Sequence, residues 1–331
     1  MVKRTGWPLA IVFLLGGFLF LAGCIRPIPN TLPIARFSAV SLHGYKYAPL
    51  DVQFDGGDST DTDGYIVSYV WQFGDGTTAT GLTHLHTFTE PGSHLVTLRV
   101  QDNRGAVHTA TDEIVVLEIP AGQLLRRYEW TYQGRSHYLE ILFPASLYQR
   151  YRDQPRQPFA GNYDYDAFVL DPLDDPTLGE LAEALWNEAG GEIEAFLECA
   201  LAFVQEVIPY TPDPTEMEYP LYPLETLVDD DGGDCEDTTI LYVSLVRARG
   251  QAVSMAHVDT DDDNSPDHVL ALVPVSQSYA DGIGCPSGKA KGVWTINGQL
   301  YALAETAGFS LPLGCDPWGL EESDFKQVWN F

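Results

Sequence analysis

The sequence predicts a multidomain protein in which an all-β sandwich precedes an α+β domain, behind a short N-terminal targeting segment. From residue 34 to residue 118, short strand patterns alternate with turn-forming Gly, Pro and Asp clusters, which is typical of a sandwich. From residue 125 to residue 331, helical patterns come first and strand patterns follow, which is typical of an α+β arrangement. The 331 residues are enough for both domains.

The composition predicts a globular protein with an acidic surface. The formal net charge is -29, and the chain holds only five lysines. Nucleic-acid binding requires a basic face that neutralises phosphates, so we exclude nucleic acid as a partner. An acidic surface keeps a protein soluble and also suits basic partners.

The N-terminus has the pattern of an export signal. Lys3 and Arg4 precede the apolar run Trp7–Leu21, which is too short and too interrupted by glycine for a transmembrane helix. The residues Leu-Ala-Gly-Cys that end at Cys24 resemble the bacterial lipobox, and this resemblance implies lipidation of Cys24. Residues 1–23 are therefore predicted to be a lipoprotein signal peptide, followed by a lipidated, Pro-rich spacer over residues 24–33. An ordinary signal peptide or a short anchor is the alternative.

Acyl chains on Cys24 would tether an exported protein to a membrane surface. Position 25 is Ile rather than the Asp that retains enterobacterial lipoproteins at the inner membrane. By that resemblance, the outer membrane is the expected location if the source is a bacterium with two membranes.

The four remaining cysteines are of three kinds. Cys285 and Cys315 lie in Gly- and Pro-rich loop sequence and form the plausible disulfide pair, since export permits disulfides. Cys199 lies inside the helical pattern Ile193–Val207 and is predicted to be a small buried apolar residue. Cys235 is the odd thiol, which makes it a candidate for reactivity.

The first domain resembles a PKD domain, which is an immunoglobulin-like module. The resemblance rests on four motifs in the family's order, namely Asp58–Gly64, Tyr69-Val-Trp-Gln-Phe-Gly-Asp-Gly76, His86-Thr-Phe88 and the segment Pro91–Gly105. Gln72 stands where the family usually has Asp. Trp71 is expected to pack the core of the sandwich, and the Asp residues of the first motif are expected to form turns rather than a calcium site. The resemblance implies a spacer or adhesive module over residues 34–118, without catalytic chemistry.

Periodicity predicts the elements of the second domain. After a connector over residues 117–125, alternation around a Gln133-Gly134 turn predicts a hairpin over Tyr128–Phe143. Residues 211–225 are Pro-rich and are expected to be irregular, and residues 276–291 form a Gly-rich insertion. The remaining elements are helices over Asp175–Trp186, Glu192–Val207 and Thr238–Val246, and strands over Val253–Val258, His268–Val275, Gly292–Ile296 and Gln299–Glu305.

The segment Asp229–Ile240, DDDGGDCEDTTI, is the most informative stretch of the chain. Two glycines allow the chain to turn sharply into the predicted helix, so Cys235 is expected in the first helical turn. There, unpaired backbone N–H groups and the positive end of the helix dipole favour a thiolate. We therefore predict that Cys235 is a nucleophile.

Acidic neighbours oppose this effect, because like charge raises the pKa of a thiol. Asp234, Glu236 and Asp237 flank Cys235. The thiolate is therefore expected to depend on protonated His268 nearby, as in a Cys–His ion pair. Whether Glu236 and Asp237 point away from the sulfur into structural hydrogen bonds is left open by the sequence.

A thiol nucleophile needs a base, and the base needs an orienting acid. Only His257 and His268 follow Cys235 in the chain. His268 opens the apolar strand Val269–Val273, where its ring can face the helix terminus, whereas His257 leads into an acidic loop. We therefore favour His268 as the base. Glu305, at the end of the last predicted strand, is the candidate acid.

Together these segments resemble the transglutaminase-like cysteine peptidase superfamily, in particular its bacterial and archaeal members. The matching motifs are Phe203–Tyr210, Tyr222-Pro-Leu-Glu-Thr-Leu227, Gly233-Asp-Cys-Glu-Asp237, Asp267-His268 and Tyr301–Thr306. The resemblance spans residues 128–325 and implies a papain-like, transglutaminase-like α+β domain over residues 125–331. It implies that Cys235 is the nucleophile, His268 the base and Glu305 the acid that more distant relatives supply as Asp. The loops over residues 259–266 and 276–291 lengthen the usual spacing.

The implied chemistry is acyl transfer through a thioester at Cys235. Water as acceptor gives a peptidase or amidase, which we favour because most microbial relatives are regarded as peptidases, whereas a lysine amine gives a protein-cross-linking transglutaminase. The rival is a non-catalytic surface protein for binding or adhesion.

We predict no cofactor and no metal, because the Asp259–Asp263 loop lacks the glycine and the distal Glu of an EF-hand. The expected partners are a protein or peptide substrate at the cell surface, and the membrane through Cys24.

Overall fold

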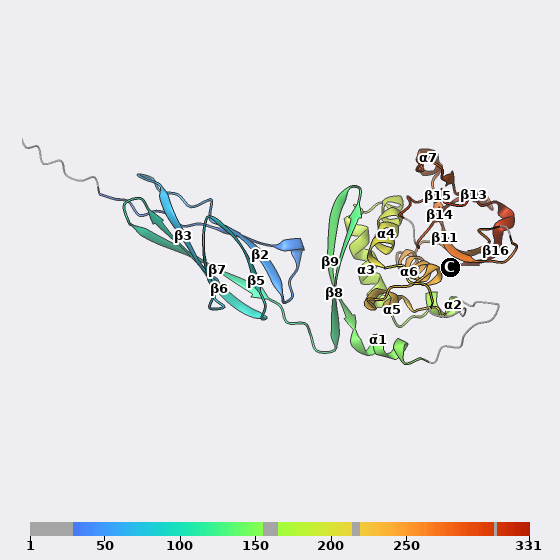
Figure 1. Cartoon of the computed structure of the whole chain (residues 1–331), viewed down its shortest axis with the longest axis horizontal. Coiled ribbons are helices and arrows are strands. Elements are labelled where there is room, and N and C mark those ends of the chain that lie inside the picture. Colours follow the sequence, from blue (N-terminus) through green and yellow to red (C-terminus); the bar gives the residue numbers. More distant parts are fainter. Residues whose placement is uncertain (1–28, 155–164, 214–218, 262, 308–309) are drawn as a thin grey trace, which may run out of the picture.

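The computed structural model describes residues 29–154, 165–213, 219–261, 263–307 and 310–331. The predicted signal peptide, the lipidation site Cys24 and the start of the Pro-rich spacer lie outside these residues. Figure 1 shows a β-sandwich, then a long hairpin, then a group of helices with a second sheet. In the part of the chain that the structure describes, no helix is both long and apolar enough to cross a membrane.

The N-terminal region is an immunoglobulin-like sandwich of two antiparallel sheets, with strand orders β1-β2-β5 and β4-β3-β6-β7. The strands are β1 (Ser38–Ser41), β2 (Leu50–Asp55), β3 (Ile66–Gln72), β4 (Thr78–Thr80), β5 (Thr83–Phe88), β6 (Gly92–Asp102) and β7 (Val107–Val116). Alternate residues of β2 are buried, as a pleated strand with one face on a core requires. Trp71 is fully buried as predicted, and its Nε1 donates a hydrogen bond of 2.8 Å to the carbonyl of Gly81.

A two-stranded hairpin stands between the sandwich and the helices (Figure 1). β8 (Gln123–Tyr132) pairs with β9 (Arg135–Pro144) around the predicted turn, in which Gln133 and Gly134 both have positive φ. Such a turn matches the twist of the two strands it joins. The hairpin packs on α4 (Ile193–Val207), where the ring centroids of Trp130 and Phe203 are 5.3 Å apart.

The sandwich contacts this hairpin through Arg127 and Glu140. Their side chains form an ion pair of 2.8 Å. Glu140 Oε1 accepts the Lys46 N–H at 2.8 Å, and Arg127 Nη2 donates to the carbonyl of Tyr47 at 2.7 Å. The Arg127 guanidinium also lies 4.6 Å from the centroid of the Tyr45 ring. Charge-assisted hydrogen bonds therefore join the two regions in addition to the connector.

Three helices form the core of the second region. α3 (Asp175–Glu188), α4 and α6 (Cys235–Ala248) pack on one another. α6 is buried on every side from Glu236 to Val246, because helices cover one part of it and the second sheet covers another. The shorter helices are α1 (Ala145–Arg152), α2 (Asp166–Val169), α5 (Pro223–Val228) and α7 (Gln277–Gly282).

The second sheet is antiparallel, with the strand order β13-β14-β11-β10-β16. Its strands are β10 (Ser254–Val258), β11 (His268–Val275), β13 (Val293–Ile296), β14 (Gln299–Ala304) and β16 (Phe325–Asn330), and a separate pair consists of β12 (Ala290–Lys291) and β15 (Cys315–Asp316). Ala271 of β11 lies opposite Ala304 of β14. The first residues of β11 and the last residues of β14 therefore lie at the same end of the sheet, near the start of α6.

The structure confirms the predicted hairpin, the three long helices and the four predicted strands of the second region, with small shifts of their ends. The expectation of an irregular segment over residues 211–225 is wrong at its end, because α5 begins at Pro223. α5 is buried throughout, so its residues show no helical alternation of polar and apolar side chains. α1, α7 and β16 were not predicted. β16 is an edge strand whose exposed residues hide the apolar alternation.

Candidate active site

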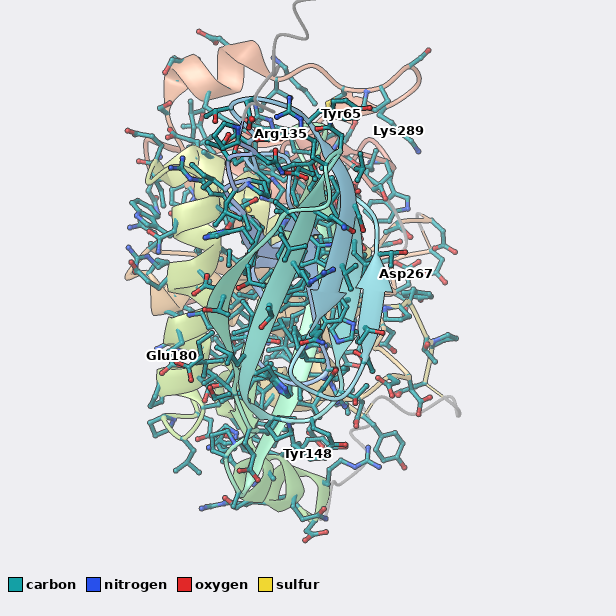
Figure 2. All side chains as sticks on the ribbon, turned by 90° about the vertical axis from the view of Figure 1, so that its left-hand side faces the viewer. Tyr65, Arg135, Tyr148, Glu180, Asp267 and Lys289 are labelled. Atoms are coloured by element: carbon teal, nitrogen blue, oxygen red, sulfur yellow. A yellow bond between two sulfur atoms is a disulfide. The ribbon has the colours of Figure 1, made fainter. Side chains whose placement is uncertain are left out.

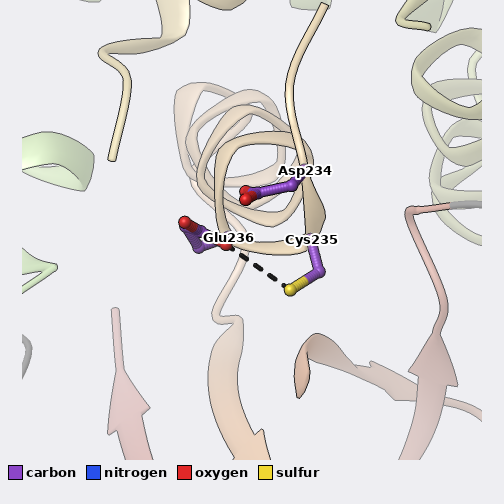
Figure 3. Close-up of side chains that lie close together, drawn as sticks. All are labelled: Asp234, Cys235 and Glu236. Carbon is purple, nitrogen blue, oxygen red and sulfur yellow. Dashed lines mark hydrogen bonds between the residues drawn. The ribbon is translucent and has the colours of Figure 1, made fainter. Parts of the chain in front are cut away.

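Cys235 is the first residue of α6, as the sequence predicts (Figure 3). Asp234 is the N-cap residue and has extended backbone angles. The turn before it requires glycine, because Gly232 has a φ of +78° and a Cβ on it would lie 1.9 Å from the Pro209 carbonyl oxygen. Only glycine permits this approach. The Gly-Gly sequence therefore brings the thiol to the N-terminus of a buried helix.

The segment after α4 holds this turn from the other side. Gly233 N–H donates to the carbonyl of Pro209 at 3.1 Å, and Thr211 N–H donates to the carbonyl of Gly233 at 2.9 Å. Tyr210 lies between these bonds, and its side chain is half-exposed. Burial raises the pKa of Tyr210, and the nearby charge of Cys235 raises it further. Tyr210 thus lies within electrostatic reach of the thiol, although sequence analysis gave it no role.

His268 and Glu305 form a buried pair. His268 Nε2 lies 2.9 Å from Glu305 Oε2, and the Glu305 side chain is fully buried. The second carboxylate oxygen, Oε1, accepts the Ala307 N–H at 2.8 Å. A carboxylate that is held on both oxygens fixes the orientation of the imidazole, and it leaves Nδ1 as the ring nitrogen outside the pair. The structure thus brings together the two residues that the sequence suggested as base and acid.

Three buried threonines lie next to this pair, two of them in α6 and the third directly after Glu305. The Thr306 hydroxyl oxygen is 3.0 Å from that of Thr238 and 2.8 Å from that of Thr239. Thr239 Oγ1 also donates to the carbonyl of Val269 at 3.2 Å. Each of the three threonines is at most 1% exposed. We call Thr238, Thr239 and Thr306 the threonine cluster.

The threonine cluster joins three segments, and each segment carries one predicted site residue. Cys235 is at the start of α6, His268 at the start of β11, and Glu305 directly after β14. Cys235 is part-exposed, the His268 side chain is 14% exposed, and the Glu305 side chain is fully buried. The thiol and the imidazole are therefore both part-exposed, whereas the carboxylate is buried. A nucleophile that substrates can reach and an acid that water cannot reach are what a thiol–imidazole–carboxylate site requires.

The acidic residues beside Cys235 have different environments. Asp237 Oδ1 accepts the Leu221 N–H at 2.6 Å, and its Oδ2 accepts the Asp234 N–H at 3.3 Å. Burial, and then the charge of Asp234, raise the pKa of Asp237 well above its usual range. Glu236 is equally buried, but its Oε2 accepts a hydrogen bond of 3.4 Å from Cys235 Sγ (Figure 3). Asp237 therefore holds the N-terminus of α6 through backbone hydrogen bonds, whereas Glu236 faces the thiol.

His257, the alternative base, lies in β10 opposite Val269. Burial lowers the pKa of His257, and the nearby His268 lowers it further. The loop between β10 and β11 is held by Asp267, whose carboxylate accepts the N–H and the hydroxyl of Thr260 at 2.9 and 2.8 Å. Asp267 itself is exposed at the side of the molecule (Figure 2). His257 thus lies on the strand next to that of His268, and its burial favours the neutral form.

Two groups of described side chains have ligand atoms close enough to share an ion, all within 4.8 Å of one another. They are Asp234, Cys235 and Glu236, and Asp259, Asp261 and Asp263. An ion in the first group would occupy the thiol of Cys235, the predicted nucleophile. In the second group, Asp259 already pairs with Lys326 Nζ at 3.3 Å.

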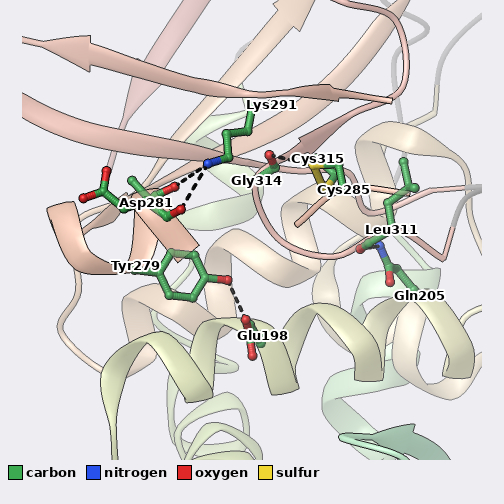
Figure 4. The surroundings of a disulfide bond; sticks show 10 residues. Glu198, Gln205, Tyr279, Asp281, Cys285, Lys291, Leu311, Gly314 and Cys315 are labelled. Carbon is green, nitrogen blue, oxygen red and sulfur yellow. Dashed lines mark hydrogen bonds between the residues drawn. A yellow bond between two sulfur atoms is a disulfide. The ribbon is translucent and has the colours of Figure 1, made fainter. Parts of the chain in front are cut away.

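Cys285 and Cys315, the pair that the sequence suggested, form a disulfide (Figure 4). Cys199 is buried as predicted, and burial raises the pKa of its thiol to about 12. Among the cysteines that the structure describes, Cys235 is therefore the one that is outside the disulfide and also exposed to solvent.

Comparison with known proteins finds similar sequences and structures for the N-terminal sandwich. Residues 45–116 match the sequence model of the PKD domain family. The chain is 38% identical over 68 residues to collagenase ColA of Clostridium perfringens, which covers 20% of this chain and 6% of that protein. The present chain thus spans only a small part of the length of this collagenase. The PKD1 domain of the Vibrio cholerae metalloprotease PrtV is 38% identical, covering 26% of this chain and 98% of that one, with a TM-score of 0.23.

A provisionally assigned cysteine protease from Cytophaga hutchinsonii covers more of the chain. It aligns with 92% of this chain and 86% of its own length, at 12% identity and a TM-score of 0.27. A score this low does not establish a shared fold for the second region. The match to the family model does establish the first region, and residues 45–116 are a PKD domain.

Proposed function

We propose that this chain is a surface-anchored thiol enzyme that transfers acyl groups through a thioester on Cys235, and that it hydrolyses peptide or amide bonds. Cys235 is the nucleophile, His268 the base and Glu305 the orienting acid. The observation that carries the proposal is the buried His268–Glu305 pair, which the threonine cluster joins to the start of α6. The second region is then a transglutaminase-like, papain-like domain over residues 125–331, behind the sandwich over residues 34–118.

The reaction begins when His268 accepts the thiol proton and Cys235 Sγ attacks the carbonyl carbon of the substrate. The backbone N–H of Cys235 lies in the first turn of α6, where it can donate to the oxyanion of the tetrahedral intermediate. His268 then gives its proton to the leaving amine, and the thioester remains. Water, deprotonated by His268, attacks the thioester and releases the acid product together with the free thiol. Glu305 holds the ring and stabilises its charged form in both halves of the reaction.

Glu236 sets a further condition on this chemistry. In the resting site, the Cys235 thiol donates to the Glu236 carboxylate. Moving the proton to His268 would leave a thiolate beside that carboxylate, which like charge disfavours. The imidazolium, paired with Glu305, offsets this repulsion. Thiolate formation in this site therefore depends on His268.

Export and anchoring are the second part of the proposal. The Cys285–Cys315 disulfide supports export, because disulfides persist in oxidising compartments. The PKD domain supports it too, since the relative that carries a similar segment is named as a collagenase. Lipid on Cys24 would hold both regions at the membrane surface. The alternatives are cross-linking by transfer to a lysine amine, and a surface protein that binds without catalysis.

Thiol labelling tests the catalytic site. In the full-length chain with Cys24→Ser, iodoacetamide near neutral pH is expected to label wild-type Cys235, and His268→Ala is expected to slow this labelling. Cys199→Ala is the matched control, because its thiol is buried and should not contribute. Labelling of Cys235→Ala to the same extent as the wild type would contradict the proposal and favour the binding protein. Isopeptide products in the presence of an added amine would identify the transferase.

A further inference from the structure

Trp318 lies against the ring of His268. The two ring centroids are 4.6 Å apart, and the ring planes are inclined by 56°. Trp318 is only partly buried, and the His268 side chain also keeps some exposure. A side chain that touches the base and is also exposed to solvent can contact a substrate that reaches this base. The acyl chemistry does not itself use Trp318.

Asp316 fixes the loop that carries this tryptophan. Its carboxylate accepts three successive backbone N–H groups, those of Trp318 at 2.8 Å, Gly319 at 2.9 Å and Leu320 at 2.6 Å. Asp316 is 1% exposed. Three hydrogen bonds to one buried carboxylate are strong and leave the loop little freedom. Leu320 is also buried, in the apolar cluster on the outer face of the second sheet.

The disulfide holds Asp316 in turn. Cys315 precedes Asp316 in β15 and is bonded to Cys285 in the loop after α7 (Figure 4). The same strand pairs with β12, where Lys291 Nζ donates to the carbonyl of Ala280 at 2.9 Å. A continuous series of contacts therefore runs from the disulfide through Asp316 to Trp318 and the base.

We propose that Trp318 is a specificity-determining residue, which forms an apolar wall of the substrate cleft beside His268, and that Asp316 and the Cys285–Cys315 disulfide are positioning elements for it. The inference rests on the proposed function. An indole face contributes apolar contact area rather than hydrogen bonds, so it selects a substrate with an apolar side chain next to the scissile amide. The ligand class is thus a peptide or amide with such a residue.

Two small aldehydes test the apolar wall formed by Trp318, and the test does not require turnover. A thiol adds reversibly to an aldehyde, so acetyl-leucinal and acetyl-glycinal should each protect Cys235 from iodoacetamide. In the wild type, acetyl-leucinal is expected to protect at about tenfold lower concentration than acetyl-glycinal. Trp318→Ala should remove most of this preference, and Trp318→Phe should retain part of it. Trp294→Ala is the matched control, because Trp294 packs on the same sheet face, against Phe325, at a ring-centroid distance of 5.0 Å.

The positioning role of the disulfide is tested by Cys285→Ser combined with Cys315→Ser, assayed without reductant. This double variant is expected to lose the preference for acetyl-leucinal as Trp318→Ala does, while Cys235 remains reactive. Asp316→Asn should have the same effect, because it weakens the acceptor for three N–H groups. Retention of the wild-type preference in both variants would overturn the positioning role.

Fluorescence tests the contact independently of catalysis. A protonated imidazole that touches an indole quenches its emission, so wild-type fluorescence should fall as the pH is lowered. This fall should be absent in Trp318→Phe and in His268→Gln, and present in Trp294→Phe. An identical pH dependence in all four proteins, or a wild type that binds both aldehydes equally, would overturn the inference. A wild type without Cys235-dependent labelling would instead contradict the proposed function.

Discussion

The hydroxyl oxygens of Thr239 and Thr306 lie 2.8 Å apart in the core of the molecule, although 67 residues separate them in the chain. Thr306 follows Glu305, and Thr239 lies one helical turn beyond Cys235. The contact therefore relates the acid to the helix that carries the thiol, without touching a reacting atom. We regard the threonine cluster as the means by which the fold sets the geometry of the site.

Removal of one hydroxyl of the threonine cluster should therefore lower the turnover rate by more than the loss of stability explains. Thr306→Val is expected to lower kcat about tenfold or more with KM little changed, because small displacements of catalytic groups are costly. Thr306→Ser keeps the hydroxyl and should restore most of the rate. Thr226→Val is the control, since Thr226 of α5 is equally buried but donates to the carbonyl of Tyr222, the N-cap residue of that helix.

Both valine variants should lose about 0.5–1.5 kcal/mol of unfolding free energy, because each removes a buried hydrogen bond whose partner keeps other hydrogen bonds. Denaturant titrations and steady-state kinetics measure the two effects separately. Equal losses of kcat in Thr306→Val and Thr226→Val would mean that the cluster has a structural role only.

Gly232 should be intolerant of any side chain. In Gly232→Ala, the new Cβ would meet the Pro209 carbonyl oxygen at 1.9 Å, and the residue would keep a φ of +78°. Gly250→Ala is the matched control, because Gly250 has a φ of +70° but no heavy atom within 4 Å of the added Cβ. The control should lose about 1 kcal/mol of unfolding free energy.

Gly232→Ala should lose clearly more than the control, because the turn must open to relieve the clash. Chemical denaturation of both variants measures the difference, and labelling of Cys235 reports whether the thiol has moved. A stability equal to that of Gly250→Ala would show that the turn tolerates the side chain.

His257 should contribute a pH dependence to stability. Its pKa is lowered in the folded protein, mainly by burial and then by His268, so the unfolded chain binds the proton more readily. The stability from neutral His257 is therefore present above the unfolded pKa of 6.5 and is lost as the pH falls through and below that value. His257→Gln should reduce the slope of the unfolding free energy against pH, by at most about 1.4 kcal/mol per pH unit.

Urea titrations between about pH 5 and about pH 7 measure this slope. His43→Gln is the control for an exposed histidine of the sandwich. A slope in His257→Gln as steep as that of the wild type would assign the acid sensitivity to another group.

Cys24 should determine where the protein is found. If its thiol carries acyl chains, the full-length chain should sediment with membranes, and Cys24→Ser should be released into the soluble fraction. Cys199→Ser should stay with the membranes, because Cys199 is a buried residue of α4. Fractionation followed by immunoblotting compares the three proteins. Cys24→Ser that remains in the membrane fraction would assign the anchor to another segment.

Features with a local signal could be predicted from the sequence. The Gly-Gly turn and the apolar run after it placed Cys235 at the start of a helix, and alternation around Gln133 placed the hairpin. His268 and Glu305 could be named because each lies at one end of an apolar strand, but their contact required the antiparallel pairing of β11 with β14. The order of motifs identified the PKD domain directly.

Other features have no local signal. The threonine cluster consists of three ordinary residues whose hydroxyls meet only after the chain has folded. Trp318 lies in a loop without periodicity, and its position depends on Asp316 and on a disulfide that closes over 30 residues. The different environments of Glu236 and Asp237 depend on Leu221, which approaches from another segment. Long-range contacts of this kind are set by packing rather than by propensity.

Trapping the acyl-enzyme tests the proposed chemistry most directly. Full-length protein with Cys24→Ser would be mixed with the activated ester para-nitrophenyl acetate, quenched in acid within the first turnover, and analysed by intact mass and peptide mapping. We predict a single acetyl group on Cys235, which accumulates in the wild type, forms more slowly in His268→Ala and is absent in Cys235→Ala. Release of product without an adduct on Cys235, or an adduct that persists in Cys235→Ala, would contradict a thioester mechanism at this residue.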